Sequence, residues 1–192
     1  LSDTIMSESV SIKETLISDI KISADRLNRI ITNLLDMTRI ESGMLKLKLE
    51  WNDINDMLSV VYGKYKKELA NYEFVKETES DLPPVKFDFG LIEQVISNIL
   101  YNAVIHTEKG TKIWIKSRKD DGSITVEIGD NGGGIKNIDR IFNKFYKENP
   151  KKTGGLGIGL SICKAITDFH NWEIRAENNN AGGATFTLTI PV

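Results

Sequence analysis

The chain has 192 residues, of which 40% are hydrophobic and 27% are charged, and its formal net charge is −2 at pH 7. This length fits one globular domain with a helical appendage, and the hydrophobic fraction can fill a core. The small net charge gives no reason to expect a nucleic-acid partner. No apolar run approaches the ~18 residues of a membrane span, and no signal peptide is recognisable. The single cysteine, Cys163, cannot form an internal disulfide or a metal cluster alone, and we expect a reduced core residue.

The first predicted element is a long helix between about Ser9 and Ser42. Its apolar or small residues recur in steps of three and four, close to a heptad seam: Leu16, Ile20, Ala24, Leu27, Ile31, Leu34 and Thr38. Gly43 then fits the end of the helix. Such a helix is too long for a lone surface element, so we expect a bundle or coiled coil to bury the seam. The alternative is an ordinary amphipathic helix packed on its own domain.

The rest of the chain predicts an α/β sandwich in which a sheet packs on helices. Strands are expected near residues 46–51, 73–78, 112–119, 123–130, 172–178 and 184–190, and helices near residues 54–69, 90–106 and 157–170. The alternating run at 46–51 would link the long helix to the sandwich. Trp51, Trp114 and Trp172 fall in strand-like runs, where packing in the core or at an edge is a sufficient explanation.

The helix predicted at 90–106 carries a polar ridge at every fourth position: Gln94, Asn98, Asn102 and His106. A solvated helix face would normally hold charged residues, so neutral amides are unusual here. Side chains four residues apart project to one place, and amide oxygens suit a hydrated Mg²⁺ that bridges phosphates. The alternative for an isolated Asn pair is a plain polar helix surface.

A carboxylate and two glycine clusters follow this helix. Asp130 ends the strand-like run 123–129, and the three glycines after it allow a flat ring to approach the backbone. A carboxylate accepts from the exocyclic amine of adenine but repels the oxygen of guanine, which favours ATP over GTP. The alternative is an ordinary Asp-Asn-Gly turn.

A second glycine cluster, residues 154–159, leads into a helix with apolar spacing, where backbone N–H groups can bind phosphate. It matches neither a P-loop nor a dinucleotide-binding fingerprint.

The segment between the glycine clusters, residues 136–153, is basic and mostly irregular. Flanking glycines and clustered lysines indicate a mobile lid that closes on phosphates. Three aromatic residues would anchor the closed lid to the domain: Phe142, Phe145 and Tyr146.

In this order and spacing, residues 98–102, 130–135, 141–146 and 154–160 resemble the N, G1, F and G2 boxes of two-component sensor histidine kinases. The ATP-binding domain of that family shares its fold with the gyrase, Hsp90 and MutL ATPases. Residues 182–191 look like the end of that domain, and residues 26–43 resemble the second helix of the dimerisation and phosphoacceptor hairpin, nearest to potassium-sensing Kdp-type kinases. The resemblance implies an α+β, two-layer sandwich at 44–192, preceded by a partial hairpin at 1–43.

By this resemblance Asn102 is the Mg²⁺ ligand, Asn98 supports the metal or the phosphates, and Asp130 binds the adenine amine. The base is expected beside Gly132 and Gly134. Phosphate is expected at the second glycine cluster: Gly155, Gly157 and Gly159. The catalytic set comprises Asn98, Asn102 and Lys147. The other nucleotide-binding residues are expected around these groups: His106, Ile135, Lys144, Phe145, Tyr146, Leu156, Ile158, Leu160 and Thr185.

One position separates two enzyme classes. The related ATPases carry a water-activating Glu four residues before the Mg²⁺-binding Asn, where this chain has Asn98. An amide cannot take up a proton at neutral pH, so phosphoryl transfer is favoured over hydrolysis. Two positions depart from the family. Ile105 stands where many members have a Lys, and Lys147 stands where many have an Arg with its bidentate fork.

The phosphorylated histidine of the family lies on the first helix of the hairpin, and neither histidine of this chain fits its motif. His106 ends the polar ridge, and His170 is expected to be a helix-end residue. Residues 1–6 look like a stub of that first helix. The resemblance implies ATP and Mg²⁺ as cofactors, a response regulator as partner, homodimerisation through the N-terminal helices, and a cytoplasmic location with any membrane anchor elsewhere in the parent protein. The alternatives are a related ATPase and a nucleotide-binding or dimerisation module without kinase activity.

Overall fold

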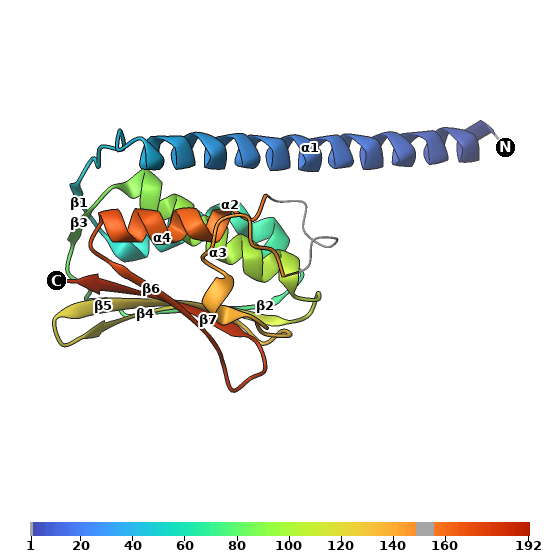
Figure 1. The fold of residues 1–192 in the computed structure, drawn as a ribbon. Coiled ribbons are helices and arrows are strands. Elements are labelled where there is room, and N and C mark those ends of the chain that lie inside the picture. The colour runs from blue at the N-terminus through green and yellow to red at the C-terminus, as the bar shows by residue number, and fades with distance from the viewer. Residues whose placement is uncertain (1, 149–155) are drawn as a thin grey trace.

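The computed structural model of the chain describes residues 2–148 and 156–192. Three helices cover one face of a five-stranded sheet, and a fourth, much longer helix lies outside them (Figure 1). The helices are α1 (Ser2–Glu41), α2 (Ile54–Leu69), α3 (Phe89–His106) and α4 (Gly159–Phe169). The predicted two-layer sandwich with a long N-terminal helix is therefore confirmed.

The main sheet has the strand order β2–β4–β5–β7–β6, with β2 and β4 parallel and the other neighbours antiparallel. These strands are β2 (Glu73–Thr78), β4 (Lys112–Asp120), β5 (Ser123–Asp130), β6 (Glu173–Asn178) and β7 (Ala184–Pro191). Strand β5 lies in the middle of the sheet, and its last residue is Asp130. The topology therefore brings this carboxylate to the end of the central strand, next to the turn that joins β6 to β7.

A second, two-stranded sheet corrects the sequence prediction. Strand β1 (Glu50–Asn52) pairs antiparallel with β3 (Val85–Phe87). The strand expected at 46–51 is thus shorter, begins at Glu50 and ends at Asn52, and β3 was not predicted. The backbone N–H of Lys48 donates to the Asp88 carboxylate at 2.9 Å and takes no part in a strand. A three-residue strand such as β3 is too short to show an alternating pattern.

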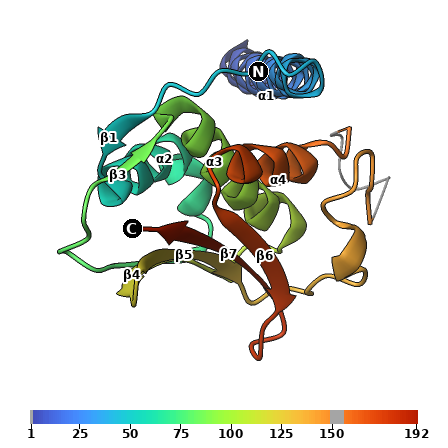
Figure 2. The same cartoon turned by 60° about the vertical axis from the view of Figure 1, so that its left-hand side comes forward.

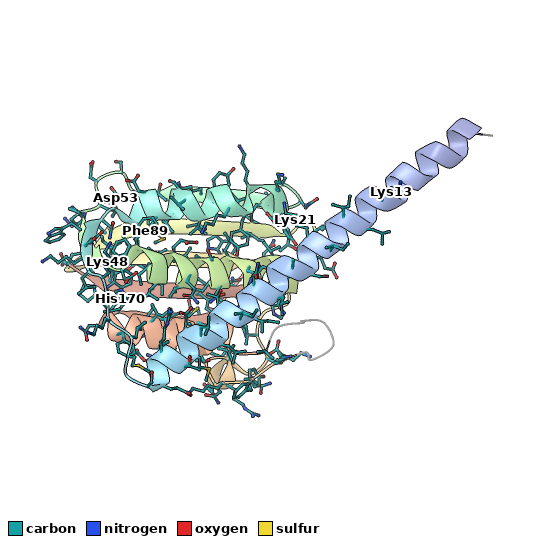
Figure 3. All side chains as sticks on the ribbon, turned by 90° about the horizontal axis from the view of Figure 1, so that it is seen from above. Lys13, Lys21, Lys48, Asp53, Phe89 and His170 are labelled. Atoms are coloured by element: carbon teal, nitrogen blue, oxygen red, sulfur yellow. The ribbon has the colours of Figure 1, made fainter. Side chains whose placement is uncertain are left out.

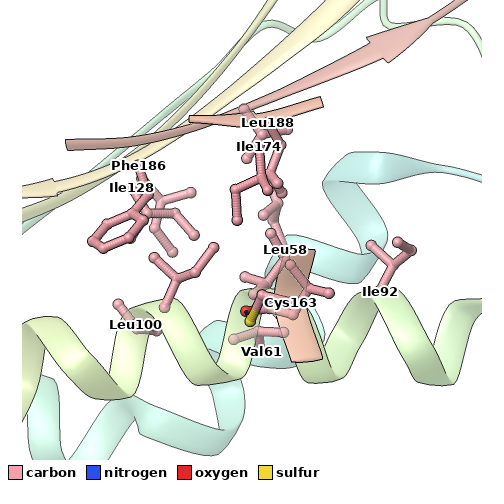
Figure 4. Packing of buried hydrophobic residues seen from close by; sticks show 14 of the residues in the cluster. Leu58, Val61, Ile92, Leu100, Ile128, Cys163, Ile174, Phe186 and Leu188 are labelled. Carbon is pink, nitrogen blue, oxygen red and sulfur yellow. Dashed lines mark hydrogen bonds between the residues drawn. The ribbon is translucent and has the colours of Figure 1, made fainter. Parts of the chain in front are cut away.

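The core lies between the main sheet and helices α2, α3 and α4. The inward-facing residues of β5 alternate, and Ile124, Val126 and Ile128 are each at most 1% exposed. Figure 4 shows Ile128 facing Leu100 of α3 across the interface between sheet and helices. Cys163 on α4 is fully buried and free, as predicted for a core residue.

The tryptophans differ in their surroundings. Trp172 is 5% exposed and packs edge-on against Phe87, with 5.5 Å between ring centroids, and Trp114 is half-buried. Packing in the core or the sheet therefore accounts for both. Trp51 is 67% exposed, and its ring lies 5.1 Å from the ammonium group of Lys86. Core packing does not explain Trp51, because its side chain lies on the exposed side of the small sheet.

Helix α1 lies above the other helices (Figure 2), and its N-terminal part, including Lys13, projects beyond the domain (Figure 3). All the seam residues named above are exposed, so the domain does not bury the seam. Helix α1 does pack on its own domain, through Met37 and Ile40 near its C-terminal end and not through the seam, so both alternatives for this helix remain predictions. The helix is continuous from Ser2, so residues 2–6 are no separate helix stub, and Gly43 follows its end with φ +66°. None of the described helices is both long and apolar enough to cross a membrane.

The face of α1 that contacts the domain is largely polar. The Nε2 of Gln94 on α3 donates to the Asp36 carboxylate at 2.8 Å and to the Asn33 side-chain oxygen at 3.3 Å. The Arg29 guanidinium stacks on the Tyr101 ring with its central carbon 3.4 Å from the centroid, a cation–π contact. Met37 is buried and Ile40 packs on the core, so α1 is held on the domain by apolar contacts as well as by hydrogen bonds and charge.

Asp88 joins three segments at one end of the domain. One carboxylate oxygen caps α3 by accepting from Leu91 N–H at 3.1 Å. The other accepts from Lys48 N–H, and the Asp88 N–H donates to His170 Nε2 at 3.1 Å. His170 Nδ1 donates to Ile166 O at 2.8 Å, so its imidazole is neutral with the proton on Nδ1. His170 is thus a helix-end residue, as predicted, and Figure 3 shows it at the same end as Lys48.

Candidate functional site

The polar ridge of α3 divides between two surroundings. Gln94 bonds to α1, as described above, so the long helix occupies its side-chain amide. Asn98 is 8% exposed and lies beside the first turn of α4, where a Cβ added to Gly159 would be 3.8 Å from its side-chain oxygen. Asn102 is half-buried, and His106 is exposed at the end of the helix. The ridge therefore contributes Asn98 and Asn102 to one place, but not Gln94.

The Asn98 amide nitrogen is buried and has no hydrogen-bond partner among residues 2–148 and 156–192. The nearby Cys163 thiol is a weak acceptor and does not satisfy it. Burial raises the pKa of that thiol to about 12, and the Asn98 amide opposes the rise. A buried amide without a partner costs stability, so we expect a ligand acceptor at this position.

The Asp130 carboxylate is held by the glycine loop that follows it. Asp130 is 7% exposed, and its Oδ1 accepts from Gly132 N–H at 2.8 Å. Burial raises the pKa of the carboxyl above its usual value, while the N–H groups of Gly132 and Ala184 oppose that rise. The group is thus a fixed, partly desolvated acceptor, which suits recognition of a donor on a flat ligand.

The glycines after Asp130 are required by close contacts. A Cβ at Gly132 would lie 2.6 Å from Cγ2 of Thr107, and Gly134 has φ +66°. Gly134 is also crowded, because a Cβ there would lie 2.8 Å from Oδ1 of Asn178. A side chain at either position would displace its neighbours, so the loop keeps bare backbone beside Asp130.

The start of α4 faces the same region. Ile158 occupies the N-cap position, and no side chain of residues 2–148 or 156–192 caps the first N–H groups of the helix. The free N–H groups of a first turn attract anions. Because Asn98 lies against Gly159, these N–H groups and the buried amide are close together. Phosphate oxygens fit this arrangement.

A divalent metal would depend on these amides and on ligand oxygens. Among the described ranges, no group of three His, Cys, Asp or Glu side chains could hold a metal ion. Mg²⁺ accepts oxygen ligands and retains several waters. The Asn98 and Asn102 side chains therefore fit a hydrated ion that is carried by phosphates, but not a metal held by protein ligands alone.

Comparison with known proteins identifies this arrangement. The family model described as histidine kinase-, DNA gyrase B- and HSP90-like ATPase matches residues 88–192, more than half of the chain. The chain belongs to this ATPase family. The matched region begins at Asp88 and contains α3, the Asp130 loop and α4.

Relatives of this ATPase-family chain are sensor histidine kinases. Sensor protein KdpD of Clostridium acetobutylicum is 35% identical over 184 residues, 93% of this chain and 20% of KdpD. Alginate biosynthesis sensor protein KinB of Pseudomonas aeruginosa is 33% identical over 92% of this chain and 30% of KinB. The chain thus spans about a fifth to a third of these relatives. Because KdpD and KinB are almost equally similar, the comparisons do not select the Kdp subtype.

A solved structure also covers the long helix. Histidine kinase ThkA, in complex with the response regulator protein TrrA, matches with a TM-score of 0.71 and 28% identity. The match covers 93% of this chain and 52% of ThkA. The likeness therefore extends beyond the ATPase domain to most of α1.

The lid of this ATPase-family domain is described only in part. Gly155 lies outside the described residues, as do residues 149–154. Tyr146 is half-buried, and the Arg140 guanidinium lies 5.2 Å from its ring centroid. Gly157, with φ +73°, packs on the lid backbone, because a Cβ there would lie 2.6 Å from Tyr146 O. Phe142 also packs on the core. Two of the three predicted anchors are therefore in place.

Two lid residues lie differently from the prediction. Phe145 is 67% exposed and has φ +63°, so it does not anchor the lid in this structure. Lys144 forms an ion pair with Glu41, the last residue of α1, at 2.5 Å. Its ammonium group therefore points at the long helix. Lys147 is half-buried beside Gly157.

The remaining predicted site residues surround the glycine segments. Ile158 is 2% exposed, Leu160 is half-buried and Leu156 is 37% exposed. Thr185 on β7 is 7% exposed, and its hydroxyl accepts from Asn179 Nδ2 at 3.1 Å. Their contact with a nucleotide stays a prediction.

Sequence reasoning missed Asn178, the last residue of β6, and Asn179, the first residue of the turn between β6 and β7. Asn179 Nδ2 donates to Asp130 O at 2.9 Å, and Asn178 bonds to the backbone of Ile135. The run of three asparagines before Gly182 was the available signal, since Asn side chains often bond to nearby backbone. Only the fold could place this turn against the Asp130 loop.

Proposed function

We propose that this chain is the ATP-binding catalytic region of a two-component sensor histidine kinase. It transfers the γ-phosphoryl group of Mg-ATP to a histidine outside this chain, for relay to a response regulator. The observation that carries the proposal is the buried Asp130 carboxylate beside glycines that admit no side chain. A fixed acceptor next to bare backbone suits the adenine amine and the flat face of the base.

Each part of the site has a separate task in this proposal. Asp130 accepts from the adenine amine, and the first turn of α4 binds phosphate oxygens through backbone N–H groups. The side-chain nitrogen of Asn98 donates to a phosphate oxygen or a metal-bound water, which would satisfy the buried amide. Asn102 provides its side-chain oxygen to the hydrated ion. Mg²⁺, when bound, neutralises charge on the phosphates.

The identity of Asn98 supports transfer over hydrolysis. A water nucleophile needs a base in reach, and an Asn amide cannot take up a proton. In α3, Asn98 stands at the position where the related ATPases carry the water-activating Glu. Positioning of the phosphates then supplies most of the acceleration, as is usual in phosphoryl transfer.

The acceptor is proposed to lie elsewhere because neither histidine of this chain suits the role. His170 uses both ring nitrogens to join α4 to the start of α3. His106 lies on α3, at the edge of the pocket itself. A partner response regulator and dimerisation through α1 belong to the same proposal. The ThkA complex with TrrA supports the first, and the exposed seam of α1 supports the second.

Calorimetric titration with a non-hydrolysable ATP analogue and Mg²⁺ tests the proposal. The wild-type chain should bind, and Asp130→Ala should bind more weakly while retaining its thermal unfolding midpoint. Absence of binding to the wild-type chain would contradict the proposal and leave a degenerate module. When binding is found, a separate histidine-containing hairpin is added with ATP. Acid-labile phosphate on the hairpin supports a kinase, whereas release of inorganic phosphate alone identifies an ATPase.

A further inference from the structure

The turn between β6 and β7 is fastened to the glycine loop by one exposed side chain. The backbone N–H of Ile135 donates to Oδ1 of Asn178 at 2.7 Å, and Nδ2 of Asn178 donates to Ile135 O at 2.8 Å. The amide thus pairs with both backbone groups of Ile135, as a neighbouring strand would. Ile135 belongs to none of the described strands, so the side chain of Asn178, at the end of β6, supplies the bonds that a strand backbone would make.

The next residue fastens the other end of the loop. Nδ2 of Asn179 donates to Asp130 O at 2.9 Å and to the Thr185 hydroxyl at 3.1 Å. Its Oδ1 accepts from the N–H groups of Ala181 and Gly183 at 3.0 and 3.1 Å. This amide is fully satisfied, so it fixes the turn and the backbone of Asp130 together.

Two glycines mark where the turn and the loop approach closely. A Cβ at Gly134 would lie 2.8 Å from Asn178 Oδ1, and one at Gly183 would lie 2.0 Å from Asp130 O. The turn therefore lies directly against the loop that begins at Asp130. A shift of the turn at these two contacts would move the loop.

We propose that Asn178 is a positioning residue of the adenine pocket. It holds Gly134 and Ile135 in the conformation that accepts the base before ATP arrives, and Asn179 does the same for Asp130. This inference rests on the proposed function, because it assumes that the Asp130 loop binds the base. Asn178 touches neither phosphate nor metal in this arrangement and acts through the loop.

The size of the effect follows from the bonds that are lost. A net hydrogen bond between protein groups is equivalent to a factor of about 2 to 12 in an equilibrium constant. The apparent affinity falls with the fraction of loops in the competent conformation. Loss of both Asn178 bonds should therefore weaken ATP binding about tenfold. The folded state as a whole should be little affected, because the Asn178 side chain is exposed.

The test compares Asn178→Ala with Asn180→Ala, a matched control. Asn180 lies in the same turn, is exposed, and forms no hydrogen bond with the described residues. Calorimetry measures the ATP dissociation constant of both variants with Mg²⁺. Amide hydrogen exchange at Ile135 is measured without and with saturating ATP, and thermal unfolding midpoints are recorded without nucleotide.

Asn178→Ala should bind ATP about tenfold more weakly than Asn180→Ala, with an equal unfolding midpoint. Its Ile135 amide should exchange faster without nucleotide and should slow again when ATP is bound. Equal ATP affinities would overturn the proposal. It would also be overturned if Asn178→Ala lowered the midpoint and accelerated exchange throughout the domain, because the role would then be structural. Wild-type protein that binds no ATP would refute the proposed function and this inference with it. In that case, faster exchange of the Ile135 amide in Asn178→Ala would show that Asn178 holds the loop even though no ATP binds.

Discussion

Asp130→Asn changes one atom of the pocket and has a calculable effect on nucleotide choice. A carboxylate accepts with both oxygens, whereas an amide has one acceptor and one donor. In the wild type, the Gly132 N–H donates to Asp130 Oδ1 at 2.8 Å. In the variant, the amide oxygen must take the place of Oδ1 in order to accept this bond. The NH₂ group then faces the adenine amine, donor against donor. Losing a hydrogen bond to a charged group costs about 1.5–3 kcal/mol, which is roughly 10- to 150-fold in the dissociation constant of ATP.

The same substitution should not destabilise the fold. Burial raises the folded-state pKa of Asp130 above its ordinary value of 3.8. The folded chain therefore holds this proton more tightly than the unfolded chain does. The carboxyl favours folding fully below pH 3.8, and that contribution is lost as the pH rises through the folded-state pKa. At pH 7 the neutral amide removes a buried charge, so urea unfolding should give equal or greater stability.

The assay is calorimetry with ATP and with GTP, and the readout is the ratio of their dissociation constants. The NH₂ group can donate to the guanine oxygen, so the preference for ATP should fall. An unchanged ATP dissociation constant would refute the assignment of Asp130 to the base. An equal loss of both nucleotides, accompanied by a lower unfolding midpoint, would refute it as well.

Three further predictions concern stability and are measured by urea unfolding. Gly183→Ala places a Cβ 2.0 Å from Asp130 O, so strain should lower the free energy of unfolding by about 1–3 kcal/mol or more, whereas Gly133→Ala, with nothing within 4 Å, should not. Gly63 lies within α2, where an added Cβ meets nothing within 4 Å. Gly63→Ala should therefore raise the free energy of unfolding by about 0.5–1 kcal/mol through the higher helix propensity of Ala, and an unchanged free energy would contradict this reasoning. Burial lowers the folded-state pKa of His170, so the neutral ring stabilises the fold above the ordinary value of 6.5, and that stability is lost as the pH falls below it. His170→Gln should show a smaller loss between pH 7.5 and 5.5 than the wild type.

The sequence predicted the long, regular elements well. Strands β2 and β5 and helix α2 match their expected bounds, because each has a clear period and a turn or cap at its ends. Asp53, for example, caps α2 by accepting from Asn55 N–H. Strand β3 was not predicted because three residues are too few to show an alternating pattern. The pairing of β3 with β1 is a long-range contact that local patterns do not encode.

Within the candidate site, spacing predicted which residues share a helix face but not what lies opposite that face. Gln94 follows the same fourfold spacing as Asn98, yet α1 covers it, and a sequence period contains no information about a neighbouring helix. Lys144 likewise belongs to the basic lid but pairs with Glu41. The role of Asn178 depends on the approach of two loops that are 43 residues apart in the chain.

The contact between α1 and the domain has a mechanical consequence. The short segment 44–49 joins helix α1 to the rest of the domain, and polar groups such as Gln94 and Lys144 contact the helix. Water can replace the exposed Lys144–Glu41 ion pair at a net cost of about 1 kcal/mol or less, whereas the bonds of Gln94 to Asn33 and Asp36 are partly buried. Among the α1 side chains that the structure describes, Met37 is buried and Ile40 packs on the core. Detachment of α1 would therefore expose these two apolar side chains, and added salt would weaken the Lys144–Glu41 ion pair.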